Sequence, residues 1–259
     1  MSKEALLQIR DLTKIYTDDS GEKTVLKDLD LDVEKSEFLC ILGPSGCGKS
    51  TLLRCIAGFE EYSGSVSVDG TQRREPGIDR FMVFQDFNQL FPWKTVINNV
   101  AYPLSLNIKA PKAEIKERAL EALNKVGLSG CKDQYPHQLS GGMKQRVAIA
   151  KALALRSPII LMDEPFAALD AMTRSGLQKE MLSISESEKN TIIFITHNIQ
   201  EAIILGTRIL VFGQQGHILF DEKNPMQRPV TPASEGYGEL WEELHHALYE
   251  GSLPAKTSK

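Results

Sequence analysis

The sequence has no long hydrophobic run, no secretion signal and no excess of basic residues. The longest uninterrupted apolar stretch, Phe38–Leu42, is much too short to cross a lipid bilayer. The first residues, Met-Ser-Lys-Glu-Ala-Leu-Leu-Gln-Ile, are too polar for a secretion signal. The net charge of −4 does not favour nucleic-acid binding, which usually requires a basic face. We therefore expect a protein that neither spans a membrane nor binds nucleic acid.

Cysteine is scarce as well. The four cysteines, Cys40, Cys47, Cys55 and Cys131, contain no Cys-x-x-Cys pair. This spacing argues against a zinc site and against a disulfide framework, and it suits a reducing cytosol. We expect small buried side chains, except that Cys47 lies in a loop where alkylation could block ligand binding.

What the sequence does contain is a regular succession of strand and helix patterns. Alternation over residues 6–16 and 24–33 predicts an antiparallel hairpin, and apolar runs predict buried strands at Phe38–Leu42, Ile159–Asp163 and Thr191–Ile195. Helical patterns follow the later strands, so we expect a parallel sheet covered by helices. With 259 residues, the chain is long enough for one large domain with an inserted lobe.

Residues 86–157 are mostly helical and form the expected inserted lobe. After residue 222 a proline-rich stretch begins, and Tyr237 to Glu250 has the spacing of a short amphipathic helix. The last residues are polar, and we expect them to be disordered.

One stretch has the pattern of a phosphate-binding loop. Gly43-Pro44-Ser45-Gly46-Cys47-Gly48-Lys49-Ser50 fits G-x-x-x-x-G-K-[ST]. The glycines let backbone N–H groups point at an anion, Lys49 adds a positive charge, and the Ser50 hydroxyl can bind Mg²⁺. A chance glycine-rich turn is the alternative. The apolar strand before the loop and the helical pattern after it argue for nucleotide binding.

A nucleotide's metal ion also needs an acidic partner. Asp163 ends a buried strand, where ligands collect in open α/β sheets, and we expect it to coordinate Mg²⁺ directly or through water. Glu164 follows it and could act as the general base on the attacking water. Taken alone, these acids could be an ordinary solvated loop start, but the phosphate loop makes the catalytic interpretation much stronger.

Two further polar residues follow predicted strands. His197 comes directly after the strand that ends at Thr196 and could hydrogen-bond the γ-phosphate, although a lone histidine here is more often structural. Gln85 follows the apolar run 81–84 and could bind both Mg²⁺ and the attacking water. The alternative interpretation is that Gln85 is an ordinary polar residue at the end of a strand.

A second anion-binding helix start lies at Leu139-Ser140-Gly141-Gly142-Met143-Lys144-Gln145-Arg146. One nucleotide rarely needs two such helix ends from a single subunit. The simplest explanation is that this one serves the ATP of a neighbouring copy.

Together these motifs resemble those of the ATP-binding-cassette (ABC) ATPases, to about residue 222. The matches, in chain order, are Tyr16, Gly43–Ser50, Gln85, Leu139–Gln145, Ile159–Glu164, Ala168-Leu169-Asp170 and His197. The resemblance implies nucleotide contacts at Tyr16, Gly43, Pro44, Ser45, Gly46, Cys47, Gly48, Lys49, Ser50 and Thr51. It implies a signature, acting on the other subunit's ATP, at Leu139, Ser140, Gly141, Gly142, Met143, Lys144 and Gln145.

The resemblance also implies the fold and the assembly. The fold is an α/β P-loop NTPase: a RecA-like mixed sheet with an antiparallel β subdomain, plus an inserted α-helical subdomain. We expect an ATPase domain at 1–222, with the core at about 1–85 and 158–222, the helical subdomain at about 86–157, and a tail at 223–259. Two copies would form a head-to-tail dimer around two ATP molecules and Mg²⁺. Tyr16 would stack on adenine, and Asp170 would link the two sites.

Within the family, the sequences of these motifs are similar to those of importer subunits for nitrate, sulfonate, taurine and bicarbonate. Met143 replaces the usual glutamine after the two glycines, and Ala167 stands where serine is frequent, but neither position supplies a catalytic group. The resemblance implies a membrane permease and a periplasmic or lipid-anchored solute-binding protein as partners. It also implies a peripheral location at the cytoplasmic face of the membrane. Phe91-Pro92-Trp93 is either a core anchor or part of a groove for the permease.

Two alternatives remain open. The first is the ATPase of an exporter or lipoprotein-release system. The second is a soluble cassette ATPase acting on DNA or ribosomes. The stretch from Thr51 to Leu139 is short and lacks heptads, and the charge is acidic, so the second alternative is the weaker one.

Overall fold

The computed structural model describes residues 5–18, 21–85, 89–249 and 251. The chain forms two compact units, one from Met1–Pro76 with Thr191–Lys259 and the other from Gly77–Asn190. Within the described part of the chain, no helix has the length and apolar character needed to cross a membrane. The last residues, which the sequence predicts to be disordered, include 252–259, and these lie outside the described residues. Residues 86–88, at the start of the expected helical lobe, also lie outside them.

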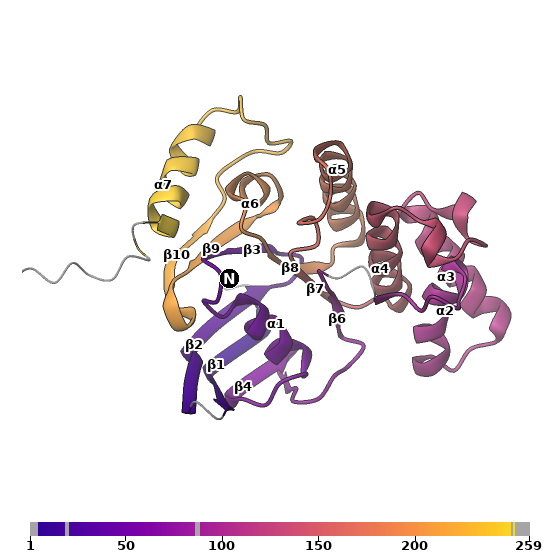
Figure 1. Cartoon of the computed structure of the whole chain (residues 1–259), viewed down its shortest axis with the longest axis horizontal. Helices are drawn as coiled ribbons and strands as arrows, with labels where there is room; N and C mark the ends of the chain where they lie inside the picture. The colour runs from indigo at the N-terminus through magenta and orange to yellow at the C-terminus, as the bar shows by residue number, and fades with distance from the viewer. Residues whose placement is uncertain (1–4, 19–20, 86–88, 250, 252–259) are drawn as a thin grey trace, which may run out of the picture. The chain divides into compact units, whose positions relative to one another are not determined.

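The first unit contains an antiparallel sheet built on a long hairpin (Figure 1). Its strands are β1 (Ala5–Asp18), β2 (Gly21–Glu34), β4 (Ser63–Val68) and β5 (Thr71–Gln72), in the order β2-β1-β4-β5. Leu7 and Ile9 alternate with half-buried or exposed residues and are fully buried themselves, as a strand with one face on the core requires. The predicted hairpin is therefore confirmed.

The same unit contains four strands in the order β10-β9-β3-β8. They are β3 (Phe38–Leu42), β8 (Thr191–Ile195), β9 (Arg208–Phe212) and β10 (Ile218–Lys223). β3 is parallel to both of its neighbours, and every residue of β3 and β8 is buried. Helix α1 (Lys49–Ala57) follows β3, and α6 (Ile199–Leu205) follows β8 and contacts β3. The predicted parallel pairing of buried apolar strands is confirmed.

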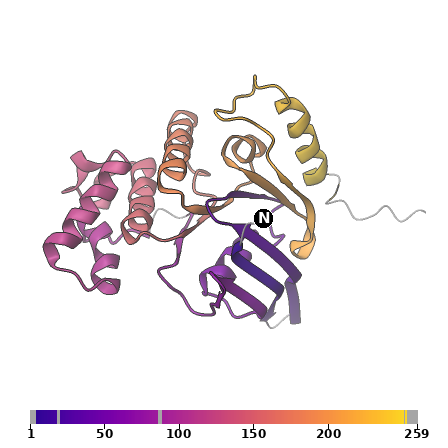
Figure 2. The ribbon, with the colours of Figure 1, turned by 180° about the vertical axis from the view of Figure 1, so that it is seen from behind.

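The last helix, α7 (Tyr237–Tyr249), packs against α6, β9 and β10. Figures 1 and 2 show it lying beside β10 from opposite sides of the molecule. Leu240, Leu244 and Leu248 are buried because they share one face at helical spacing. The predicted amphipathic helix in the tail is therefore present, and it covers part of its own unit.

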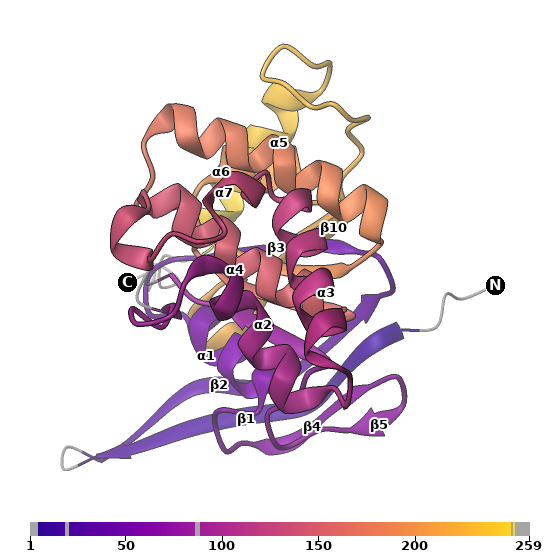
Figure 3. The same ribbon diagram turned by 90° about the vertical axis from the view of Figure 1, so that its right-hand side faces the viewer.

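Among its described residues, the second unit has two parallel strands and four α-helices. β6 (Arg80–Val83) pairs with β7 (Ile159–Asp163), and Val83 lies opposite Met162. The helices are α2 (Val96–Asn107), α3 (Lys112–Lys125), α4 (Gly141–Leu155) and α5 (Ala171–Glu188), and α2, α3 and α4 pack on one another (Figure 3). Ile115 and Ala119 of α3 are buried, as the apolar spacing of this helix predicts.

The compact second unit is larger than the helical lobe predicted from sequence. It includes β6, β7 and α5 in addition to the helices between residues 86 and 157. The division of the chain into a RecA-like core and a helical subdomain stays a prediction, because compactness of a unit does not by itself define the family's subdomains.

Candidate nucleotide-binding site

The phosphate-loop residues form a tight turn between β3 and α1. Gly48 has φ = +111° at the N-cap of α1, and a Cβ atom there would lie 2.8 Å from the carbonyl oxygen of Val25. Only glycine fits this position without strain. The first N–H groups of α1 have no acceptor within the helix, so they are available to an anion at the loop.

Lys49 lies inside this turn. Its ammonium group donates to the carbonyl oxygens of Gly43 at 2.7 Å and Pro44 at 2.9 Å, and the residue is only 7% exposed. Ser45, Gly46 and Ser50 are exposed. The loop therefore combines a buried positive charge with an exposed rim of hydroxyl and backbone groups, as phosphate binding requires.

A cavity of about 690 Å³ borders the loop. Its walls are residues 22–25 of the hairpin, residues 44–47 of the loop, and Gln214 and Gln215. Gly216, beside these glutamines, donates its N–H to the carbonyl oxygen of Cys47 at 3.0 Å. Sequence reasoning missed the hairpin and the two glutamines as cavity walls, because they are far from the loop along the chain and match no motif.

Tyr16 lies near the end of β1, half-buried and held by several neighbours. The Lys14 ammonium lies 4.4 Å from the centre of its ring, and Thr51 and Glu60 influence its hydroxyl. Burial, followed by smaller effects from these partners, raises the pKa of the Tyr16 phenol. Thr51 belongs to α1, so the structure links the predicted adenine-binding ring to the phosphate-loop helix.

His197 is exposed directly beyond β8. β8 is parallel to β3, and the N–H of Thr196 donates to the carbonyl oxygen of Ile41 at 3.2 Å. The two strands end at the same edge, so His197 and the phosphate loop both follow strand ends there. Thr196 donates to the buried Glu201 at 2.5 Å, which fixes the backbone before His197.

The second unit brings together three other predicted site residues. Gln85 follows β6, while Asp163 ends β7 and Glu164 comes next, so all three lie at the carboxyl ends of two paired parallel strands. Asp163 is 8% exposed, whereas Gln85 is exposed. Glu164 has φ = +45°, a conformation that costs energy for a residue with a side chain and is typical of functional turns.

The signature segment begins α4 as predicted. The Ser140 hydroxyl accepts a hydrogen bond from the N–H of Met143 at 3.3 Å, and Ser140 is exposed. A Cβ atom on Gly142 would lie 2.5 Å from a methyl carbon of Thr173, so this glycine permits close packing against α5. The exposed helix start keeps its first N–H groups accessible to an anion.

Gln145 differs from the rest of the signature. Its side chain is fully buried, donates to the carbonyl oxygen of Phe84 at 3.4 Å, and accepts from the Gln89 amide at 3.4 Å. Phe84 directly precedes Gln85. Gln145 therefore connects α4 to the segment around Gln85 inside one subunit, a role that the sequence pattern did not reveal.

Asp170 has a clear local role. Its carboxylate accepts the N–H of Thr173 at 3.0 Å and caps α5. This backbone hydrogen bond, with smaller help from the Thr173 side chain, lowers the pKa of the exposed Asp170 carboxyl. The predicted link between two nucleotide sites remains an expectation.

The cysteines behave as small core residues. Cys40, Cys47 and Cys55 are buried, and Cys131 is half-buried. Burial raises the pKa of Cys47 despite the opposing charge of Lys49, and it raises the pKa of Cys55 to about 12. Because the thiolate is the reactive form, the Cys47 thiol is a weak nucleophile at neutral pH.

Residues 26–167 match the family described as ABC transporter. The chain belongs to this family. As a member, it is an ATP-binding ATPase subunit of an ABC transporter with an α/β P-loop NTPase fold. The predicted fold class and ATPase activity are confirmed.

Curated relatives of this ABC ATPase cover almost its whole length. An uncharacterized ABC transporter ATP-binding protein of Methanocaldococcus jannaschii is 47% identical over 95% of this chain and 92% of that protein. An aliphatic sulfonates import ATP-binding protein of Bacillus cereus is 41% identical over 95% and 97%. A bicarbonate transport ATP-binding protein of Synechocystis is 43% identical over 87% and 81%.

Solved ABC cassettes share the fold. The dimeric structure of MJ0796, described as a bacterial ABC transporter cassette, has a TM-score of 0.75 and 34% identity over 85% of this chain and all of that one. A dimeric post-hydrolysis state of the same cassette, bound to ADP and Pi, has a TM-score of 0.74 and 32% identity over 85% and 100% of the chains.

This ABC ATPase also has a groove of about 530 Å³ in its second unit. The groove is lined by Trp93, Lys94, Thr95, Asn98, Ala101, Tyr102, Ser105, Lys112, Ile115, Lys116 and Tyr135. Trp93 is 70% exposed, which is far more than a core anchor shows. The ring of Phe91 packs edge-on against Tyr102, with 5.1 Å between centroids. Within the Phe91-Pro92-Trp93 segment, Phe91 and not Trp93 is therefore the anchor.

Proposed function

We propose that this ABC ATPase binds MgATP between two copies of itself and hydrolyses it to drive a membrane importer of a small anion. The observation that carries the proposal is that one chain contains two separate anion-binding elements. A buried Lys49 sits in a phosphate loop, while an exposed Ser140 opens a second anion-binding helix. One copy supplies the first element to an ATP and the other copy supplies the second.

Within each site, the phosphate loop and Lys49 hold the phosphates, and Tyr16 stacks on adenine. The Ser50 hydroxyl, the Gln85 amide oxygen and the Asp163 carboxylate are oxygen donors of the kind that Mg²⁺ prefers, and we assign the metal to them. The bound metal neutralises phosphate charge. Asp163 is buried at a strand end, which suits a charge held for a cation.

We assign the attacking water to Glu164. Its carboxylate removes a proton from the water as the water oxygen bonds to the γ-phosphorus and the bond from that phosphorus to the β–γ bridging oxygen breaks, which releases ADP and phosphate, while Gln85 orients the water. His197 donates a hydrogen bond to the γ-phosphate, and Asp170 links the two sites across the dimer. Glu164 occupies a strained turn after a buried strand, and such turns hold side chains in place for catalysis.

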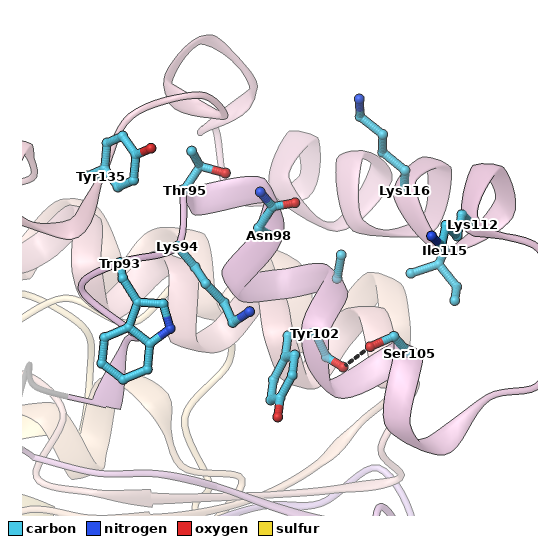
Figure 4. Close-up of a pocket in the computed structure, with 11 residues that line it drawn as sticks. Trp93, Lys94, Thr95, Asn98, Tyr102, Ser105, Lys112, Ile115, Lys116 and Tyr135 are labelled. Carbon is cyan, nitrogen blue, oxygen red and sulfur yellow. Dashed lines mark hydrogen bonds between the residues drawn. The ribbon is translucent and has the colours of Figure 1, made fainter.

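The membrane permease docks, we propose, in the groove lined by Trp93 and its neighbours (Figure 4). Trp93 and Tyr135 offer aromatic surface, and Lys112 and Lys116 of α3 add positive charge, so a short helix with apolar and acidic residues would fit. The Lys94 ammonium lies 4.5 Å from the centre of the Tyr102 ring and is held in the groove.

The transported solute does not contact this subunit, so its class is inferred from the relatives. Those relatives are named for aliphatic sulfonates and bicarbonate, and a further one for nitrate in Synechococcus elongatus. We therefore propose import of a small anion of this kind. A periplasmic or lipid-anchored solute-binding protein would deliver the anion, and the ATPase would lie peripherally at the cytoplasmic face of the membrane.

Co-expression of this chain with candidate permeases of the sulfonate, bicarbonate and nitrate importer types provides the test. Proteoliposomes holding the complex, with MgATP on the side of the ATPase and the binding protein of the same importer on the other side, should accumulate labelled nitrate, sulfonate or bicarbonate. Efflux in place of uptake would support the exporter alternative. ATPase activity that no permease stimulates would support a soluble cassette ATPase.

A further inference from the structure

The positively charged side chain of Lys14 lies over one face of the Tyr16 ring. Lys14 and Tyr16 are two residues apart on β1. The Lys14 ammonium lies 4.4 Å from the ring centre, well within the range of a cation–π contact. One face of this ring is therefore occupied by the protein's own cation.

The cation is held in place from its other side. Lys14 Nζ lies 3.0 Å from a carboxylate oxygen of Glu60 and donates to the carbonyl oxygen of Glu61 at 2.9 Å, and the residue is only 8% exposed. Burial alone would lower the pKa of Lys14, but the hydrogen bond and charge of Glu60 outweigh it and raise that pKa. Lys14 therefore stays charged at neutral pH.

The hydroxyl end of Tyr16 is influenced by the same carboxylate. After burial, Thr51, the residue after Ser50 in α1, lowers the pKa of the Tyr16 phenol and Glu60 raises it. Glu60 therefore acts on the phenol and also holds the cation that lies over the ring. Rotation of the ring would break its contact with the Lys14 ammonium.

We propose that Lys14 and Glu60 are positioning residues that prepare the Tyr16 ring to take a purine base on its remaining face. The inference rests on the proposed function, in which Tyr16 stacks on adenine. The Lys14 ammonium draws electron density toward its own face, which strengthens stacking of an electron-rich base on the opposite face. Fixing the ring in advance also removes the entropy cost of ordering it on binding.

The test compares Mg-ADP with Mg-pyrophosphate, which fills the phosphate loop but has no base. In titration calorimetry, Lys14→Met and Glu60→Gln should each weaken ADP binding by about fivefold, the size of one partly buried cation–π contact. Their pyrophosphate affinity should match the wild type. In steady-state hydrolysis, KM for ATP should rise while kcat stays nearly constant. Lys14→Arg keeps a cation and should restore ADP binding.

A matched control lies on the same hairpin. Arg10 and Asp32 form an exposed ion pair with 2.7 Å between the charged groups, so Asp32→Asn removes a charge interaction of the hairpin that involves none of Lys14, Tyr16 and Glu60. This variant should bind ADP like the wild type. If Lys14→Met and Glu60→Gln fold like the wild type by circular dichroism but weaken ADP and pyrophosphate binding equally, the positioning role is wrong.

A Tyr16→Leu variant distinguishes adenine stacking on Tyr16 from the positioning of Tyr16 by Lys14 and Glu60. If Tyr16→Leu keeps wild-type ADP affinity, adenine stacking on Tyr16 itself is wrong. If Tyr16→Leu weakens ADP binding but Lys14→Met and Glu60→Gln do not, only the positioning role of Lys14 and Glu60 is wrong.

Discussion

The ammonium group of Lys49 lies 2.7 Å from the carbonyl oxygen of Gly43, the first residue of its own phosphate loop. The lysine therefore points back along the loop and places its charge inside the turn, where the N–H groups of α1 also converge. The side chain and the backbone therefore direct positive charge at the same small region, an arrangement that suits the binding of a polyphosphate.

Replacing Lys49 by alanine should abolish nucleotide binding. The change removes the charge that we propose binds the phosphate oxygens, so ADP affinity should fall by at least about 100-fold in equilibrium dialysis. Lys27→Ala removes an exposed lysine of β2 and serves as the control. Wild-type affinity of the Lys49→Ala protein would refute the phosphate-binding role of the lysine.

Glu164→Gln should separate ATP binding from ATP hydrolysis. Glutamine keeps the shape of the side chain but cannot accept the proton of the attacking water, so kcat should fall about 10² to 10⁴-fold. Binding should persist, and the protein should elute as an ATP-dependent dimer in size-exclusion chromatography. Glu117→Gln, an exposed substitution on α3, is the control. Undiminished hydrolysis by Glu164→Gln would show that another group is the general base.

The shared site can be tested with mixed subunits. Lys49→Ala disables the phosphate loop, and Ser140→Arg blocks the exposed start of α4. If each ATP needs the loop of one copy and the signature of the other, a mixed dimer holds one doubly impaired site and one intact site. Mixing two inactive variants should therefore restore part of the ATPase activity. Failure despite demonstrated mixed dimers would argue against independently working shared sites.

Gln145 should contribute to stability. Gln145→Leu removes the hydrogen bonds of Gln145 to the Gln89 amide and the Phe84 carbonyl, and these two groups keep the 3.2 Å hydrogen bond between them, so the loss should be about 1 kcal/mol of unfolding free energy. Urea denaturation monitored by circular dichroism measures this loss. Gln200→Leu, at an exposed position of α6, should change stability much less. Equal stability of the two variants would mean that Gln145 makes no net contribution.

The groove should depend on its exposed aromatic residue. Trp93→Ala removes the largest accessible apolar surface of the proposed permease site, so capture of the detergent-solubilised permease should weaken by about 30-fold. Leu106, also exposed on α2 but outside the groove lining, provides the control as Leu106→Ala. Equal binding of permease by both variants would place the docking surface elsewhere.

Several features follow directly from the sequence because they depend on neighbours along the chain. The phosphate loop is one, since strand, glycine turn and helix are adjacent, and α1 ends at Gly58 with φ = +80° as expected of a glycine C-cap. Buried strands such as β3 and β8 are a second such feature, because a short uninterrupted apolar run is typical of a parallel strand that is covered on both faces.

Helix α2 shows where local reasoning stops. Pro103 lies inside it, although proline usually ends a helix. The buried Asn99 of the same helix donates to the carbonyl oxygen of Phe91 at 3.1 Å and accepts the N–H of Phe91 at 2.8 Å. These tertiary hydrogen bonds hold the start of α2 and the loop before it, and no local pattern encodes them.

The sequence by itself determined the chemistry of this protein: a phosphate loop, acids after a buried strand, and a second anion-binding helix start. The tertiary structure decided how those groups are held. Glu60, in the segment between α1 and β4, forms an ion pair with Lys14 of β1, and Gln145 donates to the carbonyl oxygen of Phe84. Motifs depend on covalent neighbours, whereas these contacts join residues brought together only when the chain packs, so spacing along the sequence cannot reveal them.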